Sequence, residues 1–298
     1  MLQSWNEKNK ALIVSINGEL LHRDHAGISP FDSVVQGGDA VWEGLRLYNG
    51  CIFALAEHLE RLRSSAKALA FVDIPDNEHI VTQIKQTLNA NNMHNNVHIR
   101  LTLTRGIKVT SGMDPRLNQS GSTLIILAEH KPPVYDKSGL KLITSSIRRF
   151  PPDCMDPKIH HANLLQSILA KIEANHVGAD DALMLDYQGF IAETNATHLF
   201  IVYNNIVYTP HTHACPEGIT RSTVLDICKQ EGIDFCVKNL SLTEAYRANE
   251  MFCTGTMGEL AGIVEVDGRK IGSTEQPLTR LLSKLYSQRT HNSGVQIV

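Results

Sequence analysis

The first half of the chain alternates short apolar runs with tight turns. One pair of apolar runs, 11–16 and 19–21, is separated by Asn17-Gly18. A second pair, 45–48 and 51–53, is separated by Asn49-Gly50. Asparagine followed by glycine favours the two-residue turn of a hairpin, because both residues tolerate a positive φ. The pattern therefore predicts two antiparallel strand pairs.

Two amphipathic helices and two further strands are predicted next. Apolar residues recur at helical spacing over 55–69 and again over 77–91. Strand-like runs follow at 97–104 and 122–128. The residues expected on the inner helix faces are Leu55, Leu59, Leu62, Ala66 and Leu69 in the first helix, and Ile80, Ile84 and Leu88 in the second.

A polar stretch with two adjacent prolines interrupts the pattern. Pro132-Pro133 lies between polar residues and is followed by Gly139. Such a composition is typical of a connection between domains. We therefore expect a smaller N-terminal domain over 1–131, a linker over 132–139 and a larger C-terminal domain over 140–298.

The second half again favours strand pairs over strand–helix–strand units. A strand is expected over 140–148, and a helix over 162–176 with Leu165, Ile168, Leu169 and Ile172 facing inward. This arrangement predicts an α+β class with mainly antiparallel sheets rather than a doubly wound parallel fold. Hairpin turns are expected at 187–189, 204–205 and 267–268, and further helices at 221–231, 242–248 and 277–289.

Composition and charge exclude several classes of protein. The 298 residues carry a net charge of -3, with 42% hydrophobic and 20% charged residues. These values are typical of a globular protein and favour neither nucleic acid nor a membrane surface as a partner. Six cysteines scattered along a chain of this length indicate reduced thiols, so we expect a cytoplasmic protein. No apolar run is long enough to span a bilayer.

A lysine and a carboxylate indicate cofactor chemistry. Lys158 lies in a loop before the helix expected at 162–176, and Glu193 follows a predicted hairpin. A lysine amine forms a Schiff base with an aldehyde, and a carboxylate keeps a pyridine nitrogen protonated. Alone, each residue would be an ordinary surface charge. Together they favour pyridoxal 5'-phosphate, with Lys158 as the catalytic residue.

Two turns rich in small residues supply candidate phosphate ligands. Gly218, Ile219 and Thr220 precede a predicted helix, whose free backbone N–H groups attract an anion. Thr256 lies in a second turn of small residues. Arg61, on the first predicted helix, offers a forked contact to the same phosphate.

A zinc site is the rival interpretation of one loop. His211, His213 and Cys215 alternate along the chain and offer ligands of the kinds that zinc prefers. No matching fourth ligand is evident beyond Cys253, and prolines at 210 and 216 favour a plain loop. We therefore expect no metal site.

Ordered motifs across most of the chain resemble one family, the class IV, fold-type IV pyridoxal-phosphate aminotransferases. This family includes branched-chain amino acid, D-amino acid and (R)-amine aminotransferases, and aminodeoxychorismate lyase. The match covers about 13–271, nearly the whole chain. The motifs are Val41-Trp42-Glu43-Gly44-Leu45-Arg46-Leu47-Tyr48, His58-Leu59-Glu60-Arg61-Leu62, Ile99-Arg100, Lys158, Ala170-Lys171-Ile172-Glu173-Ala174, Ala192-Glu193-Thr194-Asn195, Glu217-Gly218-Ile219-Thr220-Arg221 and Gly255-Thr256-Met257-Gly258-Glu259.

The resemblance implies a role for each matching position. Lys158 would carry the cofactor and move protons, and Glu193 would contact the pyridine nitrogen. The fold implied is two α/β domains with the cofactor between them, usually in a homodimer. The phosphate would be held by Arg61, Ile219, Thr220 and Thr256, with Gly218 beside them, and the substrate by Gly37, Trp42, His98, Arg100 and Met257.

The implied activity is ping-pong transfer of an amino group from an amino acid to a 2-oxo acid such as 2-oxoglutarate. Trp42-Glu43-Gly44-Leu45-Arg46 is most similar to branched-chain enzymes, so an L-branched-chain donor is expected. Gly37 and His98 stand where those enzymes have tyrosines, and no tyrosine follows Lys158. A D-amino acid or (R)-amine transaminase, or a lyase on the same scaffold, therefore stays open.

Overall fold

The computed structural model describes residues 5–133, 135 and 138–298 and divides into two compact units. The N-terminal unit contains residues 5–132, Ile159–Asn163 and Thr290–Val298. The C-terminal unit contains the described part of Pro133–Lys158 and Leu164–Arg289. The sequence placed 159–163 and 290–298 within its second domain, and those domain bounds remain a prediction. Residues 134, 136 and 137 of the expected linker lie outside the described residues.

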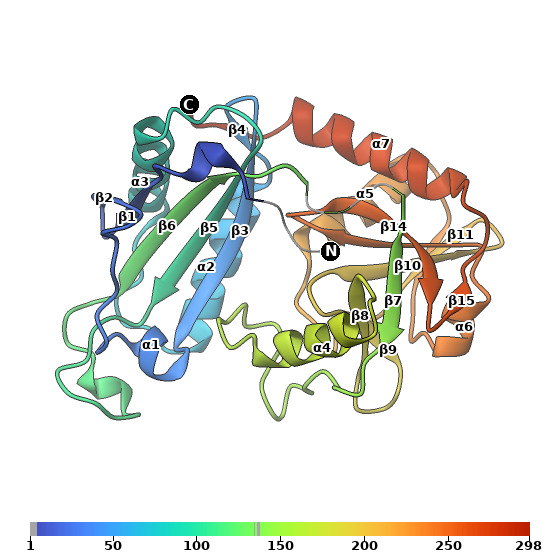
Figure 1. Cartoon of the computed structure of the whole chain (residues 1–298), viewed down its shortest axis with the longest axis horizontal. Coiled ribbons are helices and arrows are strands. Elements are labelled where there is room, and N and C mark those ends of the chain that lie inside the picture. Colours follow the sequence, from blue (N-terminus) through green and yellow to red (C-terminus); the bar gives the residue numbers. More distant parts are fainter. Residues whose placement is uncertain (1–4, 134, 136–137) are drawn as a thin grey trace. The chain divides into compact units, whose positions relative to one another are not determined.

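An antiparallel sheet forms the centre of the N-terminal unit (Figure 1). Among the described residues it has seven strands in the order β16-β4-β3-β5-β6-β1-β2. The strands are β1 (Ile13–Ile16), β2 (Glu19–His22), β3 (Ala40–Tyr48), β4 (Cys51–Ile52), β5 (Val97–Thr104), β6 (Thr123–His130) and β16 (Val295–Gln296). The helices of this unit are α1 (Ser33–Gly37), α2 (Leu55–Ala68) and α3 (Asn77–Ala90), with short turns η1 (Glu7–Asn9) and η2 (Pro115–Leu117).

Both predicted asparagine–glycine turns are present. Asn17 and Gly18 join β1 to β2 with φ of +50° and +84°. Asn49 and Gly50 join β3 to β4 with φ of +48° and +82°. Two successive positive φ angles match the right-handed twist of the paired strands, which explains why these residues occupy the turns.

Alternation along β3 places successive side chains on the two faces of the sheet. Val41, Leu45 and Leu47 are fully buried in one core with residues of α2 and α3. The next residues along the strand, including Trp42 and Arg46, point to the opposite face of the sheet because successive side chains alternate. Figure 1 shows α2 and α3 on this sheet. Most residues predicted on the inner faces of the two helices are buried in this core, namely Leu55, Leu59, Leu62, Ala66, Ile80, Ile84 and Leu88. Leu69 is partly buried and packs against it.

A mixed sheet forms the centre of the C-terminal unit. Its strand order over the described residues is β12-β11-β10-β13-β14-β7-β8-β9, with β15 paired to β14. Within these described strands, the parallel pairs are β11–β12, β14–β7 and β7–β8. The strands are β7 (Leu140–Thr144), β8 (Asp181–Leu185), β9 (Ile191–Thr194), β10 (His198–Tyr203), β11 (Ile206–Thr209), β12 (Phe235–Val237), β13 (Glu250–Gly255), β14 (Glu259–Val266) and β15 (Arg269–Lys270).

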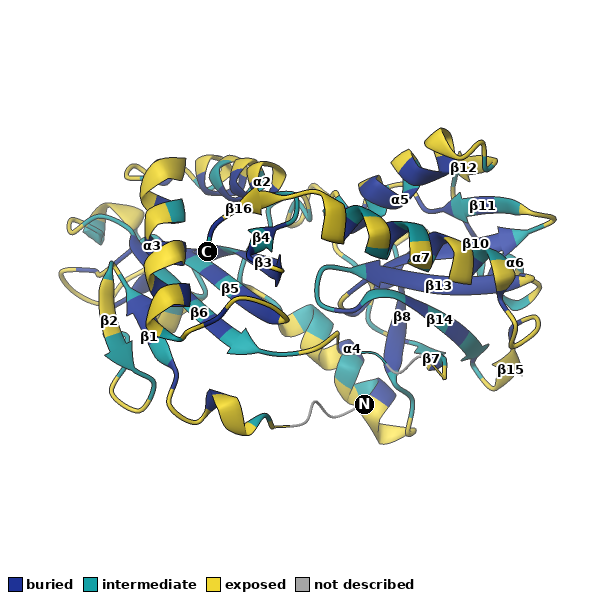
Figure 2. Ribbon diagram, turned by 90° about the horizontal axis from the view of Figure 1, so that it is seen from above, coloured by how far each residue is buried: buried dark blue, intermediate teal, exposed yellow. Residues whose placement is uncertain are grey.

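Helix α4 (Leu165–His176) is oriented opposite to the prediction. Its alanines Ala170 and Ala174 are fully buried and pack with Ala182 and Met184 of β8. The predicted inward residues are instead exposed, Ile168 by 52% and Ile172 by 56%. The small face fits close to the sheet, and the aliphatic stripe of Leu165, Ile168, Leu169 and Ile172 is left on the surface. Figure 2 shows the mixed exposure along this helix.

The remaining helices lie near the predicted positions. They are α5 (Ile219–Gln230), α6 (Leu242–Tyr246) and α7 (Pro277–Asn292). Helix α6 begins with a capping box, in which Ser241 accepts from the backbone of Glu244 and the Glu244 carboxylate accepts from the backbone of Ser241. Within the described part of the chain, no helix has the length and apolar character needed to cross a bilayer.

Candidate active site

Lys158 lies in the loop between β7 and α4 and belongs to the C-terminal unit. Its backbone N–H donates to Oδ1 of Asp156 over 3.0 Å, which fixes the local turn. Its Nζ lies 3.4 Å from Oε1 of Glu217, and the side chain is 49% exposed. An amine with this exposure is accessible to a small molecule. Glu217 immediately precedes the glycine that caps α5.

Glu193 is a buried carboxylate on β9. Antiparallel pairing with Met184 of β8 places it within the sheet, as the preceding hairpin predicted. Its Oε1 lies 2.9 Å from Nη2 of Arg149, and its Oε2 lies 3.3 Å from Nδ1 of His198. Burial raises the pKa of Glu193 to about 7, although Arg149 opposes that rise. The carboxyl group is therefore poised to share a proton near neutral pH.

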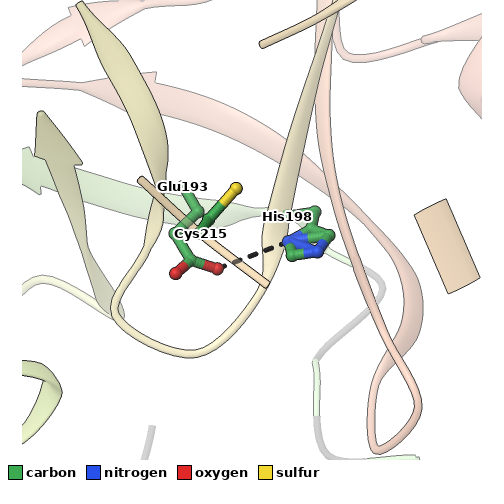
Figure 3. A group of neighbouring side chains, drawn as sticks. All are labelled: Glu193, His198 and Cys215. Carbon is green, nitrogen blue, oxygen red and sulfur yellow. Dashed lines mark ion pairs between the residues drawn. The ribbon is translucent and has the colours of Figure 1, made fainter. Parts of the chain in front are cut away.

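Cys215 completes a buried cluster with Glu193 and His198. The ligating atoms of the three side chains lie within 4.8 Å of one another (Figure 3). Burial and the neighbouring Glu193 raise the pKa of the Cys215 thiol, so it is neutral. His211 and His213 are exposed, whereas Cys215 is buried. The loop therefore directs its cysteine away from the two histidines with which the sequence had grouped it.

The start of α5 lies against the same cluster. Gly218 caps the helix, and no acidic residue occupies the first turn. A Cβ added at Gly218 would meet the His198 ring at 2.1 Å, so only glycine fits this approach. Thr220 is buried. The free N–H groups of a helix start and its dipole favour a bound anion here.

The turn between β13 and β14 holds Thr256 and Met257, both partly buried. Gly258 donates from its backbone N–H to the carbonyl of Gly255 over 3.2 Å, which closes the turn. Gly258 also lies close to Tyr135, because an added Cβ would meet that ring at 2.2 Å. Small residues thus allow a tight turn packed against the aromatic ring.

Contacts within the C-terminal unit connect these groups. Lys158 reaches Glu217, Glu217 adjoins Gly218, Gly218 abuts His198, and His198 reaches Glu193. An amine, a buried carboxylate and a helix start therefore lie within one short path. These residue types fit the aldehyde, ring nitrogen and phosphate of pyridoxal phosphate.

In the N-terminal unit, Arg61 contacts the buried Glu43. Its Nε and Nη2 donate to the two carboxylate oxygens of Glu43, each over 2.7 Å. His58 lies 2.6 Å and His160 3.3 Å from the same carboxylate. Burial alone would raise the pKa of Glu43, but His160, Arg61 and His58 together hold it well below its usual value. The network fixes α2 and the loop after Lys158 to β3.

Trp42 organises that loop through its backbone and ring. Its backbone N–H donates to the carbonyl of His160 over 3.0 Å, and its indole N–H donates to the carbonyl of His161 over 3.0 Å. The His160 ring stacks on the indole with centroids 4.3 Å apart. The Arg100 guanidinium lies 3.5 Å from the centroid of the Trp42 ring. Trp42 therefore contacts both Arg100 and the loop that follows Lys158.

His98 and Arg46 are buried on paired positions of β5 and β3. Neither the His98 ring nor the Arg46 guanidinium has a hydrogen-bond partner among the described residues. Burial, with Lys131, Arg46 and Arg100 nearby, lowers the pKa of His98 to about 3, so its ring is neutral. Gly37, by contrast, is exposed at the end of α1, and an added Cβ would meet open space.

The predicted site residues therefore divide between the two units. Lys158, Glu193, Gly218, Ile219, Thr220, Thr256 and Met257 belong to the C-terminal unit, and Gly37, Trp42, Arg61, His98 and Arg100 belong to the N-terminal unit. The sequence did not single out His198 or the pairing of Arg149 with Glu193. A histidine at the start of an otherwise apolar strand was the available signal for His198.

A family model for class IV amino-transferases matches residues 40–266. This range contains every candidate site residue except Gly37. The chain belongs to the class IV aminotransferase family. The predicted resemblance is thereby confirmed.

Relatives within the class IV family cover the chain almost completely. Branched-chain-amino-acid aminotransferase-like protein 1 of Arabidopsis thaliana is 52% identical over 292 residues, which are 97% of this chain and 53% of the relative. The chain thus spans about half the length of that protein and of a second Arabidopsis relative. A putative branched-chain-amino-acid aminotransferase of Methanocaldococcus jannaschii is 37% identical over 95% of this chain and 98% of its own length.

Solved structures of class IV enzymes share the fold. A branched-chain aminotransferase of Thermoproteus uzoniensis, crystallised with norvaline, superposes with a TM-score of 0.86 at 28% identity. The superposition covers 93% of this chain and 94% of that one. A further branched-chain amino acid aminotransferase, complexed with N-(5'-phosphopyridoxyl)-L-glutamate, has a TM-score of 0.88 at 31% identity over 95% of each chain. The predicted α+β, fold-type IV class with antiparallel-rich sheets is therefore confirmed.

Proposed function

We propose that this class IV protein is a pyridoxal-phosphate-dependent transaminase. It moves an amino group from an amino acid, most suitably an L-branched-chain acid, to a 2-oxo acid such as 2-oxoglutarate in a ping-pong cycle. The observation that carries the proposal is the path of contacts from Lys158 through Glu217, Gly218 and His198 to Glu193. The family membership supports the same chemistry.

Lys158 and Glu193 take the two chemical roles. When bound, pyridoxal phosphate supplies an aldehyde and a ring that withdraws electrons from the substrate carbon. Lys158 holds the aldehyde between turnovers, and its freed Nζ moves the proton at the α-carbon of the donor. Glu193 contacts the ring nitrogen, and Arg149 fixes the orientation of its carboxylate over 2.9 Å.

The phosphate is assigned to the start of α5 and the turn after β13. Ile219 and Thr220 present backbone N–H groups at the helix start, with Gly218 allowing close approach. Thr256 adds a hydroxyl from the β13–β14 turn. In the N-terminal unit, Arg61 is the candidate phosphate ligand, and its two bonds to Glu43 fix the direction of its guanidinium.

The substrate residues proposed on the sheet of the N-terminal unit lie on the face that carries Trp42, and Met257 is the candidate in the C-terminal unit. Trp42 supplies an apolar wall, and Arg100 above its ring supplies a charge for a carboxylate. The buried guanidinium of Arg46 beside His98 makes this face more positive, which suits an acidic acceptor such as 2-oxoglutarate. Gly37 is the remaining substrate candidate, and nothing lies within 4 Å of a Cβ added there.

A D-amino acid or (R)-amine donor is the second candidate. The neutral buried imidazole of His98 and the bare backbone at Gly37 stand where tyrosines were expected in a branched-chain enzyme. Both changes alter how a donor is oriented, while Lys158 and Glu193 retain their roles. A lyase on the same scaffold is distinguished by its release of pyruvate without any oxo acid acceptor.

A homodimer is also part of the proposal. The exposed stripe of Leu165, Ile168, Leu169 and Ile172 on α4 is apolar on a helix whose other face is already packed. A contiguous apolar surface of this kind is typical of a protein interface. We also propose a cytoplasmic location, because the six cysteines are free thiols and disulfides are rare in the cytoplasm.

A panel of half-reactions tests the donor. The cofactor-loaded protein is mixed separately with L-leucine, L-isoleucine, L-glutamate, D-alanine, D-glutamate and (R)-1-phenylethylamine, and its visible absorbance band is followed. We expect the L-branched-chain acids to bleach the band. Bleaching by the D-acids or the amine alone would replace the donor and keep the chemistry. A band that no amino donor changes would contradict transamination itself.

A further inference from the structure

Glu193, His198 and Cys215 converge from three separate segments of the C-terminal unit. Glu193 lies on β9, His198 begins β10, and Cys215 lies in the loop before α5. All three are buried, and one ligating atom of each lies within 4.8 Å of the others. Figure 3 shows the Glu193 carboxylate directed at the His198 ring, with the Cys215 thiol beside it.

We propose that these three side chains bind one zinc ion when the cofactor is absent from the full-length protein. A carboxylate oxygen, an imidazole nitrogen and a thiolate are the ligand types that zinc binds in proteins. The thiol of Cys215 and any protonated Glu193 release their protons to solvent as the ion binds. Three such ligands leave the fourth tetrahedral position for water. The site differs from the His211, His213 and Cys215 grouping, whose two histidines are exposed.

The geometry suits a small divalent cation. Oε2 of Glu193 and Nδ1 of His198 lie 3.3 Å apart, close to the separation of two ligands on one tetrahedral zinc ion. Two of the ligands are held by strands, and the third by a loop that ends at a helix cap. The His198 ring is confined further because Gly218 lies directly against it.

Charge favours zinc over larger or harder cations. A thiolate and a carboxylate together neutralise one divalent ion, and a soft sulfur ligand disfavours magnesium and calcium. Arg149 opposes any cation, because its Nη2 lies 2.9 Å from Oε1 of Glu193. The ion is therefore placed on the opposite oxygen, Oε2, which faces His198.

Occupation by zinc and by pyridoxal phosphate would be mutually exclusive. This consequence rests on the proposed function, in which Glu193 contacts the ring nitrogen of the cofactor. Binding of zinc itself does not depend on that assignment, since its three ligands belong to this chain. The inferred role is inhibition: zinc captures the newly made or stripped protein and delays its loading with cofactor.

Metal content and cobalt spectra test the site. The full-length protein is prepared cofactor-loaded and cofactor-stripped, and each form is dialysed against zinc and then against metal-free buffer. We expect one zinc per chain in the stripped protein and at least a tenfold lower content in the loaded protein. Cobalt in place of zinc should give a thiolate charge-transfer band in the stripped protein.

Variants identify the ligands. Cys215→Ser should lose the cobalt–thiolate band, and His198→Asn should lose stoichiometric zinc. Cys228→Ser is the matched control, because it removes a different buried thiol, which lies on α5. It should retain the cobalt–thiolate band and stoichiometric zinc. Melting temperatures measured alongside show which variants remain folded.

The outcomes separate the two proposals. A stripped wild-type protein that retains no zinc, or a cobalt–thiolate band that survives in folded Cys215→Ser, overturns the zinc site. A cofactor-loaded protein in which the cofactor is not covalently attached to Lys158 overturns the proposed function and not the zinc site. Equal zinc in loaded and stripped protein overturns mutual exclusion and shows that Glu193 does not serve both ligands.

Discussion

Arg149 holds Glu193 through a buried ion pair, with Nη2 of the arginine 2.9 Å from Oε1 of the glutamate. An arginine at this distance ordinarily lowers the pKa of a carboxyl group. Burial has the larger effect here, and the pKa of Glu193 is raised to about 7. The pair therefore provides an oriented carboxyl group that titrates near neutral pH.

Replacing Glu193 with glutamine should change how stability depends on pH. Between the usual pKa and about 7, the folded protein holds a proton that the unfolded chain releases, so stability falls as pH rises across that window. Glutamine lacks this titration. Relative to the wild type, cofactor-free Glu193→Gln should therefore gain on the order of 2–3 kcal/mol between about pH 5 and pH 8, measured by urea unfolding. Parallel pH profiles would contradict the raised pKa.

Gly218→Ala should disturb both the fold and cofactor binding. The new Cβ would meet the His198 ring at 2.1 Å, so the ring or the start of α5 must move. We expect a loss of about 1–3 kcal/mol in the free energy of unfolding and weaker retention of pyridoxal phosphate on dialysis. Gly27→Ala is the control, because nothing lies within 4 Å of its added Cβ. Indistinguishable behaviour of the two variants would show that Gly218 is not constrained.

The orientation of α4 is tested by a pair of substitutions. Ala174 is fully buried against β8, so Ala174→Leu should overpack this contact and cost about 1–3 kcal/mol. Ile172 is 56% exposed, so Ile172→Ala should change the stability of the monomer by at most about 0.5 kcal/mol. Chemical denaturation at low protein concentration measures both. The reverse ranking would restore the orientation that the sequence predicted.

Glu43→Gln should remove a stabilising charge from the N-terminal unit. Arg61, His58 and His160 surround the buried carboxylate, and breaking such a network costs about 3–5 kcal/mol. The folded pKa is depressed, so this contribution is present above the pKa of the unfolded chain and is lost as pH falls through the folded pKa. The stability difference between wild type and variant should shrink in acid. A difference that is constant with pH would rule out the charged carboxylate.

Local patterns predicted the strands and turns well. Strand β5 has the predicted bounds, Val97–Thr104, and the turn at Asn204 and Asn205 has the positive φ angles, +50° and +62°, that such a hairpin needs. These features depend on neighbouring residues alone. Lys158 and Glu193 were chosen as candidate cofactor groups because they belong to ordered motifs, and their roles stay predictions.

Features that depend on tertiary packing were not predictable. The periodicity of α4 revealed an aliphatic stripe, but it could not show that the small face of Ala170 and Ala174 would pack on the sheet. His198 and Cys215 meet Glu193 only because β9, β10 and the loop before α5 come together. Sequence separation had suggested His211 and His213 as the partners of Cys215, and both are exposed.

Borohydride reduction of the cofactor-loaded protein, followed by peptide mapping, tests the central claim most directly. The account predicts a reduced phosphopyridoxyl group on Nζ of Lys158 and on no other lysine. A cofactor-loaded sample in which Lys158 is unmodified, or in which another lysine carries the group, would contradict it.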